Sequence, residues 1–404
     1  MLWQRIEVRA GLLYLGLRAV SWVLLALAAR DQEPFAGVTA PGTQPGEDVD
    51  LRLSWDAQWY DRIATEGYPG DLPVDEAGEV QQNPWAFYPL FPALSRAVLL
   101  LGHTSFDVAG PLVALLAGLG AAVVMARLLR NALPAGVGQG PVLGAVAVWA
   151  AAPASPVLQM AYSESVGMLL LVLVLWALVR ERWGWAGAAA LVLGLARPIA
   201  LPLVVVVVTA ALVRVRRAGG VAAVPVRERW ALLWTLAATG ASGALWPVVA
   251  AVGAGRVDAY TATMASWRGD DAIDPLTPWV DTVTWAVEYH RPEFVVPALG
   301  MVVPLLLSLA LLVPRVAPGL DVRLRVWAAA YALYLLAVVD GHSSVVRYLV
   351  PLFPLAVVLV GAHREAVSRW WRWRTAVWIV AGVVAQAGWI WWLVVFVPPS
   401  DFPP

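Results

Sequence analysis

Residues 108–126 read VAGPLVALLAGLGAAVVMA, nineteen positions without a charged side chain, and Arg127 and Arg130 follow closely. A helix of about 20 apolar residues is long enough to cross the hydrocarbon core of a bilayer. Such runs recur along all 404 residues, of which 60% are hydrophobic, and the mean hydropathy is +0.70. A water-soluble core does not account for this composition, so the sequence predicts an all-α polytopic membrane protein.

The apolar runs predict about eleven membrane spans within a single domain over 1–404. The expected spans are 10–29, 108–126, 141–156, 164–179, 184–196, 198–213, 231–252, 294–313, 326–340, 345–361 and 375–396. The pair on either side of Arg197 is the least regular. A signal peptide is the alternative for the first run, but the ten spans that follow favour a retained anchor.

The distribution of arginine predicts the orientation, because positive charge collects on the cytoplasmic side of a membrane. Six groups of arginines fall at the same predicted side: Arg5 and Arg9; Arg127 and Arg130; Arg180 and Arg182; Arg214, Arg216, Arg217, Arg227 and Arg229; Arg315, Arg323 and Arg325; and Arg364, Arg369, Arg372 and Arg374. We therefore expect a bacterial plasma-membrane protein with a cytoplasmic amino terminus. Segments 31–107 and 254–293 then become two extracytoplasmic loops.

The first outer loop is too long for a simple connection, and long loops with their own helices are usually functional. Its beginning, 34–50, is rich in proline, glycine and acid and predicts no packed structure. Ser54 is then expected to cap a helix that starts near Asp56 and ends at Gly67. A second helix, 84–101, is short and contains prolines, which favours a position at the membrane interface.

Three motifs carry a family resemblance: Trp55-Asp56-Ala57-Gln58-Trp59-Tyr60, Phe87-Tyr88-Pro89-Leu90-Phe91-Pro92 and Tyr162-Ser163-Glu164-Ser165. Their order and spacing, with an aspartate in the first outer loop, resemble the PIG-V family of mannosyltransferases (GPI mannosyltransferase 2-like), in the GT-C class of membrane glycosyltransferases. The segments at Arg197 and Arg347 are compatible with that family. The match departs from the family at Tyr88, where phenylalanine is more common.

The resemblance implies a GT-C-like bundle that transfers mannose from a polyprenyl-phosphate-mannose donor to a glycolipid or cell-envelope glycan on the outer face, with inversion at the sugar. Eukaryotic members act on glycosylphosphatidylinositol precursors. The chain contains arginine but no lysine, which is typical of a high-GC bacterium. A bacterium would not make glycosylphosphatidylinositol precursors. The acceptor is therefore not implied by the motifs.

The chemistry of such a reaction needs one base, since a lipid phosphate leaves as a stable anion. A positioned carboxylate that takes the proton of the incoming hydroxyl accelerates transfer by roughly 10²–10⁴-fold. Asp56 is the candidate catalytic residue, and the helix dipole favours its ionised form. Trp55, Trp59 and Tyr60 are candidates to stack against the sugar or acceptor. The alternative is a solvated acid beside an ordinary aromatic membrane belt.

The leaving phosphate calls for fixed positive charge, and the arginine fork pairs well with phosphate oxygens. Arg197 and Arg347 are the donor-phosphate candidates because each lies at the outer end of an apolar run, and His342 is a further donor beside Arg347. An arginine inside a membrane is costly unless it is paired. The alternative is therefore a structural ion pair with Glu164 or Asp340.

Further contacts to sugar or acceptor are expected from Tyr162, Glu164 and Trp267. Ser163 and Glu164 form a helix-start pattern, so capping is the alternative there. Asp270, Asp271 and Asp274 lack the spacing of a calcium loop, and the histidines are scattered, so we predict no metal site and no cofactor. Cysteine is absent, which excludes thiol chemistry. The arginine-rich segments adjoin spans, so no nucleic-acid partner is expected.

Three functions remain open from the residues. The first is the lipid-linked mannosyltransferase. The second is a transporter or flippase of lipid-linked sugars, which predicts internal repeats that this chain does not display. The third is a non-catalytic membrane partner in an envelope assembly, with the long outer loop as its docking surface.

Overall fold

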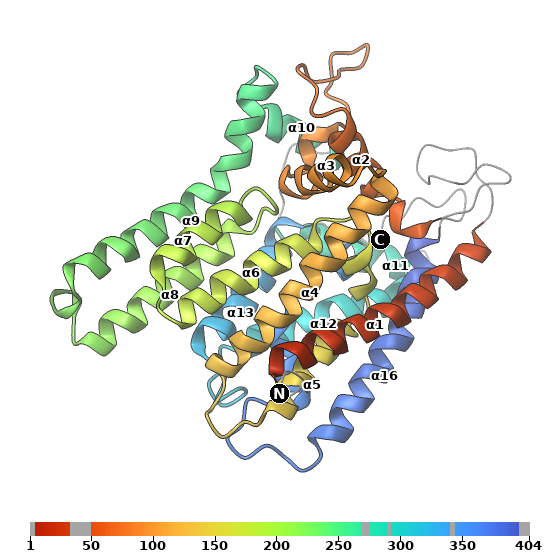
Figure 1. The fold of residues 1–404 in the computed structure, drawn as a ribbon. Helices are drawn as coiled ribbons and strands as arrows, with labels where there is room; N and C mark the ends of the chain where they lie inside the picture. The colour runs from red at the N-terminus through yellow and green to blue at the C-terminus, as the bar shows by residue number, and fades with distance from the viewer. Residues whose placement is uncertain (1–4, 33–49, 269–274, 289–291, 340–343, 396–404) are drawn as a thin grey trace.

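A computed structural model describes residues 5–32, 50–268, 275–288, 292–339 and 344–395, and this part of the chain is helical without a β-strand. The helices are α1 Ile6–Ala28, α2 Asp56–Thr65, α3 Leu90–Gly102, α4 Phe106–Ala132, α5 Gln139–Ala150, α6 Glu164–Val179, α7 Trp183–Leu193, α8 Ala200–Ala218, α9 Val226–Gly253, α10 Ala259–Arg268, α11 Thr277–Glu288, α12 Pro292–Ala310, α13 Val322–Val338, α14 Val345–Tyr348, α15 Pro354–Val360 and α16 Trp371–Trp389. Figure 1 shows their arrangement as one bundle.

Each of the eleven expected spans coincides with a helix or, at 345–361, with two short helices. Within the described residues, four segments are long and apolar enough to cross a membrane by length and composition: Ile6–Asp31, Phe106–Ala132, Val226–Gly253 and Trp371–Val394. Others are shorter. The 12 residues of α5 span only about 18 Å at 1.5 Å per residue. The all-helical, membrane-protein character is thus supported, while the count of eleven stays a prediction.

A non-helical segment separates α5 from α6 inside the bundle. Residues 151–163 contain the short 3-10 helix Ser155–Gln159, and nearly all of them are buried. Irregular backbone in a membrane protein is tolerated where protein groups satisfy its carbonyls. Arg18 of α1 does so: its guanidinium donates to the carbonyls of Ala150 and Ser155 and to the Ser155 hydroxyl. The amide of Gln386 in α16 donates to the carbonyl of Ala151 at 3.0 Å.

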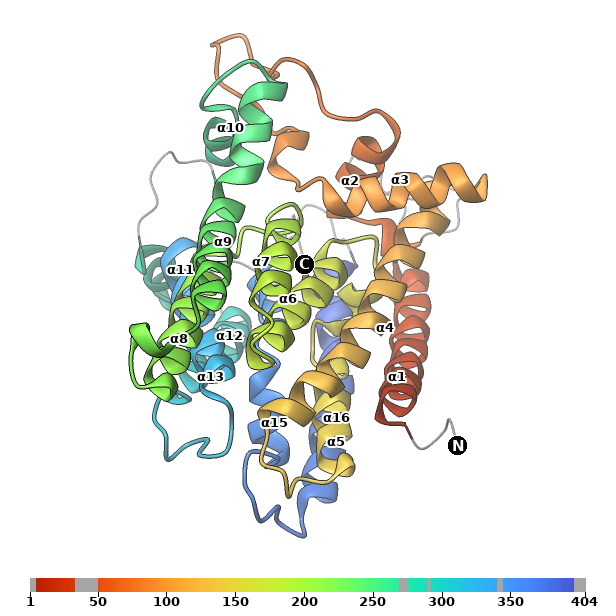
Figure 2. The ribbon, with the colours of Figure 1, turned by 60° about the vertical axis from the view of Figure 1, so that its left-hand side comes forward.

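The two segments expected in the outer loops meet at one end of the bundle. Figure 2 shows α2, α3 and α10 gathered there, with the start of α1 toward the opposite end. The Asn83 amide donates to the hydroxyl of Thr263 in α10 at 3.0 Å, and the indole of Trp246 donates to the carbonyl of Trp85 at 3.1 Å. The loops predicted to share a side are therefore joined by direct contacts.

Local geometry corrects two expectations for the first loop. The expected helix 84–101 is divided into a 3-10 turn, Pro84–Ala86, and α3, because the residue before Pro89 is disfavoured in helical backbone. Ser54 does not cap α2: the capping position is Trp55, with a φ of +60°, which is rare for an aromatic residue. Gly67, with a φ of +90°, follows the end of α2 as expected. The prediction that 34–50 has no packed structure concerns residues outside the described part of the chain, except for residue 50.

Candidate functional site

Four charged side chains from four separate segments meet below the outer-loop helices. Asp56 is the first residue of α2, Glu164 is the first residue of α6, Arg197 lies in the turn between α7 and α8, and Arg347 lies in α14. Arg347 Nη1 donates to Asp56 Oδ2 at 2.5 Å and to Glu164 Oε1 at 3.3 Å. Both predicted arginines and both predicted acids therefore belong to one network.

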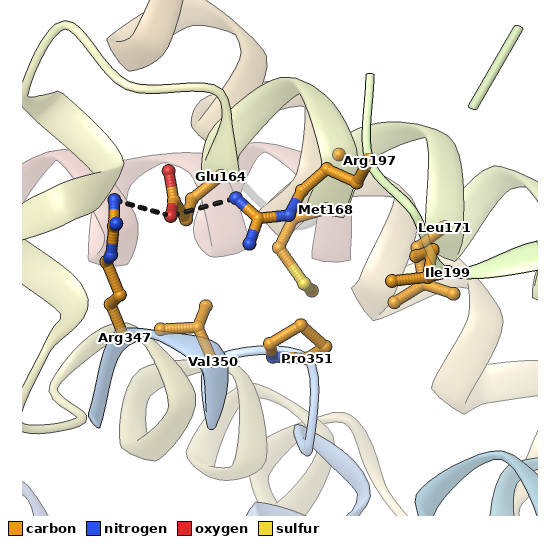
Figure 3. A pocket seen from close by; sticks show the side chains of 9 residues that line it. Glu164, Met168, Leu171, Arg197, Ile199, Arg347, Val350 and Pro351 are labelled. Atoms are coloured by element: carbon orange, nitrogen blue, oxygen red, sulfur yellow. Dashed lines mark hydrogen bonds and ion pairs between the residues drawn. The ribbon is translucent and has the colours of Figure 1, made fainter. Parts of the chain in front are cut away.

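Glu164 joins the two arginines. Its Oε1 atom lies 2.8 Å from Arg197 Nη1 as well as 3.3 Å from Arg347 Nη1, and Figure 3 shows the carboxylate between the two guanidinium groups. Its other oxygen, Oε2, is buried and has no hydrogen-bond partner among the described residues. The structural alternative raised for Arg197, an ion pair with Glu164, is therefore present. It does not exclude a binding role.

Burial makes these charges strongly coupled. The side chains of Glu164 and Arg347 are 4% and 6% exposed, whereas that of Asp56 is 21% exposed. Two guanidinium groups and two carboxylates balance in charge, as buried ionic groups must to offset their loss of hydration. Asp56 is the member of the network with the most access to solvent.

Three tyrosines surround the network. The guanidinium carbon of Arg347 lies 5.2 Å from the ring centre of Tyr162 and 5.1 Å from that of Tyr348, within the range of cation–π attraction. Tyr348 also lies 5.3 Å from the guanidinium carbon of Arg197. The Tyr60 hydroxyl donates to Ser163 Oγ at 2.9 Å. The rings thus occupy positions over the arginines, and the edges of the guanidinium groups face the acids.

The network borders a narrow cavity of about 10 Å³, enough for about one water molecule. Glu164, Arg197 and Arg347 line its charged part, and the remaining wall is apolar: Gly167, Met168, Leu171, Ile199, Val350 and Pro351. The cavity therefore has a charged end and an apolar wall.

Gly167 is required by a close approach of Arg197. A Cβ atom at this position would lie 2.8 Å from Arg197 Cδ and 3.0 Å from Arg197 Cγ. Because Gly167 lies one turn after Glu164 on α6, the absent side chain lets Arg197 cross the helix and reach the carboxylate. The sequence alone offered no reason to single out this glycine.

The predicted aromatic contacts divide into two groups. Tyr162 and Tyr60 adjoin the network, and the hydroxyl of Tyr162 donates to the carbonyl of Ser54 at 3.0 Å. Trp59 instead stacks on Phe87, with ring centres 5.7 Å apart, and meets Trp267 edge-on at 5.3 Å. These three rings form a wall on the loop side.

Other predictions for the site have mixed outcomes. Ser163 does not cap α6 with its side chain; its hydroxyl instead accepts hydrogen bonds from Tyr60 and from Arg197 Nη1. Trp55 donates weakly from its indole to the carbonyl of Val394, at 3.5 Å. The predictions on His342, Asp340, Asp270, Asp271 and Asp274 lie outside the described residues. Tyr348 was missed, although it directly follows Arg347 in the sequence.

Asp61 is separated from the network, as its position on α2 predicts. It lies about 140° around the helix from Asp56 at 3.6 residues per turn. Partial burial raises the pKa of the Asp61 carboxyl above its ordinary value, and the negative charges of Asp107 and Glu66 add to the rise. Asp61 is thus an internal comparison for Asp56, on the same helix but with acids rather than arginines around it.

No protein-family model matches the chain, and no curated protein matches it. Only the residues and the geometry of the network therefore bear on the function of this chain.

Proposed function

We propose that this chain is a membrane glycosyltransferase that moves a sugar, mannose by its motifs, from a polyprenyl-phosphate donor to a glycolipid or cell-envelope glycan. The reaction takes place at the extracytoplasmic end of the bundle in a bacterial plasma membrane. Asp56 is the base, and Arg197 and Arg347 bind the donor phosphate. Tyr162, Glu164 and the wall of Trp59 and Trp267 border the site for sugar and acceptor.

One observation carries this proposal. Asp56, 21% exposed, pairs with the buried Arg347, and Glu164 links that arginine to Arg197, beside a cavity that has a charged end and an apolar wall. A lipid phosphate needs this combination of cations and apolar surface, and a hydroxyl acceptor needs a carboxylate that solvent can reach. Arginines are costly at membrane depth, so their grouping around one cavity favours a functional role.

The proposed reaction is a single displacement. The acceptor hydroxyl gives its proton to an Asp56 oxygen while its own oxygen forms a bond to the anomeric carbon of the sugar. The bond between that carbon and the phosphate oxygen breaks, and its electron pair stays on the phosphate. The guanidinium groups stabilise the negative charge that collects there, which lowers the barrier more in the transition state than in the ground state.

Transfer of radiolabelled mannose from polyprenyl-phosphate-mannose to endogenous lipids in membranes tests the proposal. We expect Asp56→Asn to lower the rate by about 10²–10⁴-fold, the usual contribution of a general base. Asp61→Asn makes the same chemical change five residues away and should transfer at the wild-type rate. Expression and thermal unfolding of each variant are measured in parallel.

Asp56→Glu separates catalysis from structure. It keeps the negative charge and the pairing with Arg347 but displaces the carboxylate by one methylene, and a misplacement of about 1 Å can cost 10²-fold in rate. A purely structural ion pair predicts wild-type transfer from this variant. Wild-type transfer by both Asp56→Asn and Asp56→Glu would refute Asp56 as the base. Transfer that is equally fast in membranes without this chain would refute the enzyme and leave the flippase and the assembly partner as candidates.

A further inference from the structure

Asp56 pairs with Nη1 of Arg347, one of the donors that a phosphate could use. The ring centres of Tyr162 and Tyr348 lie 5.2 and 5.1 Å from the guanidinium carbon, and anions bind a guanidinium through the N–H groups at its edges. Nη1 already donates to Asp56 at 2.5 Å and to Glu164 at 3.3 Å, and Nη2 lies 3.5 Å from the hydroxyl of Tyr348. Nε is buried and has no hydrogen-bond partner among the described residues. A phosphate oxygen that binds through Nη1 therefore competes with a carboxylate.

Asp56 is the more replaceable of the two carboxylates. Its side chain is 21% exposed, against 4% for Glu164. Glu164 is also held by Arg197 at 2.8 Å and sits in the buried bundle, whereas Asp56 begins a ten-residue helix in a surface loop. A new anion would displace the partner that has fewer bonds and better access to water.

Charge balance also favours the displacement of Asp56. The two arginines and two carboxylates sum to zero, so a phosphodiester added without any release would place three anions around two cations. Replacement of Asp56 by the phosphate preserves the balance around Arg197, Arg347 and Glu164. It also leaves Asp56 without its cation.

We infer that the donor phosphate displaces Asp56 from Arg347, so that donor binding itself releases the base. This inference rests on the proposed function for its choice of ligand. Asp56 acts as an internal anion that fills the phosphate position until the lipid arrives. The carboxylate then turns toward the acceptor hydroxyl and takes its proton. Without the donor, the base stays paired and inactive.

Binding of a short-chain polyprenyl phosphate, which carries no sugar and cannot react, tests the competition directly. Its affinity is measured on purified full-length protein in detergent. Removal of an internal competitor removes the fraction of molecules in which the site is blocked, so Asp56→Asn should bind about tenfold more tightly than wild type. Arg347→Gln should bind more weakly, and Asp61→Asn should match wild type. Thermal unfolding shows whether each variant is folded.

The outcomes separate the two proposals. Tighter binding by Asp56→Asn, together with weaker binding by Arg347→Gln, supports the exchange. Equal or weaker binding by a folded Asp56→Asn overturns it, and the enzyme proposal survives if the same variant has lost transfer. If Asp56→Asn binds the phosphate more tightly but still transfers mannose at the wild-type rate, Asp56 competes for Arg347 but is not the base. That result would overturn the inference that donor binding releases a base. If Asp56→Asn does not fold, Asp56→Ser replaces it in both measurements.

Discussion

Asp56 and Arg347 are 291 positions apart in the sequence, yet they form a 2.5 Å ion pair. Each is held from a different direction: Asp56 by the start of α2, and Arg347 by the rings of Tyr162 and Tyr348 and by Glu164. Removal of one partner from a buried charge pair commonly costs about 3–5 kcal/mol. Glu164→Gln should thus be the most destabilising single change in the network, because both arginines depend on that carboxylate.

Gly167→Ala probes the position of Arg197 at this scale. The new methyl group would overlap Arg197 Cδ and Cγ and push the guanidinium away from Glu164. Alanine is favoured over glycine inside a helix by about 1 kcal/mol, so the fold should tolerate the change. We expect mannose transfer to fall at least about tenfold, the effect of roughly 1.4 kcal/mol on a barrier.

The matched control is Gly240→Ala, also within a helix, where the added atom would meet nothing within 4 Å. It should retain wild-type transfer. If Gly167→Ala does the same, the placement of Arg197 is not needed for the reaction.

Asp61 supplies a prediction on pH. Its pKa in the folded protein is raised by burial and by neighbouring acids, so the folded state holds the proton more tightly than the unfolded chain. This contribution favours folding below the unfolded pKa and is lost as pH rises through the folded pKa. Asp61→Asn should therefore unfold at a higher temperature than wild type at pH 7.

The difference in unfolding temperature between Asp61→Asn and wild type should shrink as the pH is lowered toward about 4, near the ordinary pKa of aspartate. Thermal unfolding in detergent at several pH values measures it. An advantage that is independent of pH would show that the carboxyl charge is not its cause.

At the scale of elements, the break between α5 and α6 positions the site. It sets the start of α6 at Glu164, inside the bundle. The carbonyls exposed by the break are satisfied by Arg18 and Gln386, two polar side chains that α1 and α16 contribute from opposite ends of the sequence. These contacts indicate that the outer helices stabilise the irregular segment rather than only facing lipid.

Arg18→Leu tests this role. Two buried carbonyls lose a donor, and each unsatisfied group costs about 1–3 kcal/mol. We expect a lower unfolding temperature and a parallel loss of transfer, because Glu164 would lose its support. Arg30→Leu, at an exposed position just after α1, serves as control and should unfold as wild type does. A stable, active Arg18→Leu would show that the cost of burying this arginine exceeds the value of its hydrogen bonds.

At the scale of the whole molecule, Figure 2 shows α2, α3 and α10 of the predicted outer loops at one end of the bundle. Asp56, the first residue of α2, connects the site to that end. Since the chain has no cysteine, single cysteines can report the orientation without background. Ala77→Cys lies in the first loop and Ala222→Cys between α8 and α9, both at exposed positions.

A membrane-impermeant maleimide should label Ala77→Cys in intact cells and Ala222→Cys only after permeabilisation, as the arginine distribution requires. The reverse pattern would place the site in the cytoplasm, where an extracytoplasmic acceptor could not reach it.

The sequence determined the elements with a local cause. Apolar runs produce helices at the expected positions, and the spacing on α2 separates Asp56 from Asp61 because a helical turn has 3.6 residues. It also selected Asp56, Glu164, Arg197 and Arg347, since charge beside apolar runs is costly and therefore conspicuous. It misplaced the cap of α2 by one residue, at Ser54 rather than Trp55. It placed Ser163 correctly at the start of α6, where the hydroxyl binds Tyr60 and Arg197 instead of capping the helix.

Only the tertiary structure decided how those residues combine. Ion pairing depends on distance in space, so no local pattern could show that Glu164 bridges two arginines or that Asp56 occupies the edge of Arg347. The role of Gly167 is likewise hidden, because the atoms that exclude a side chain belong to Arg197, in the turn between α7 and α8. Tertiary packing joined the predicted acids and the predicted arginines into one network, and the proposed mechanism depends on that contact.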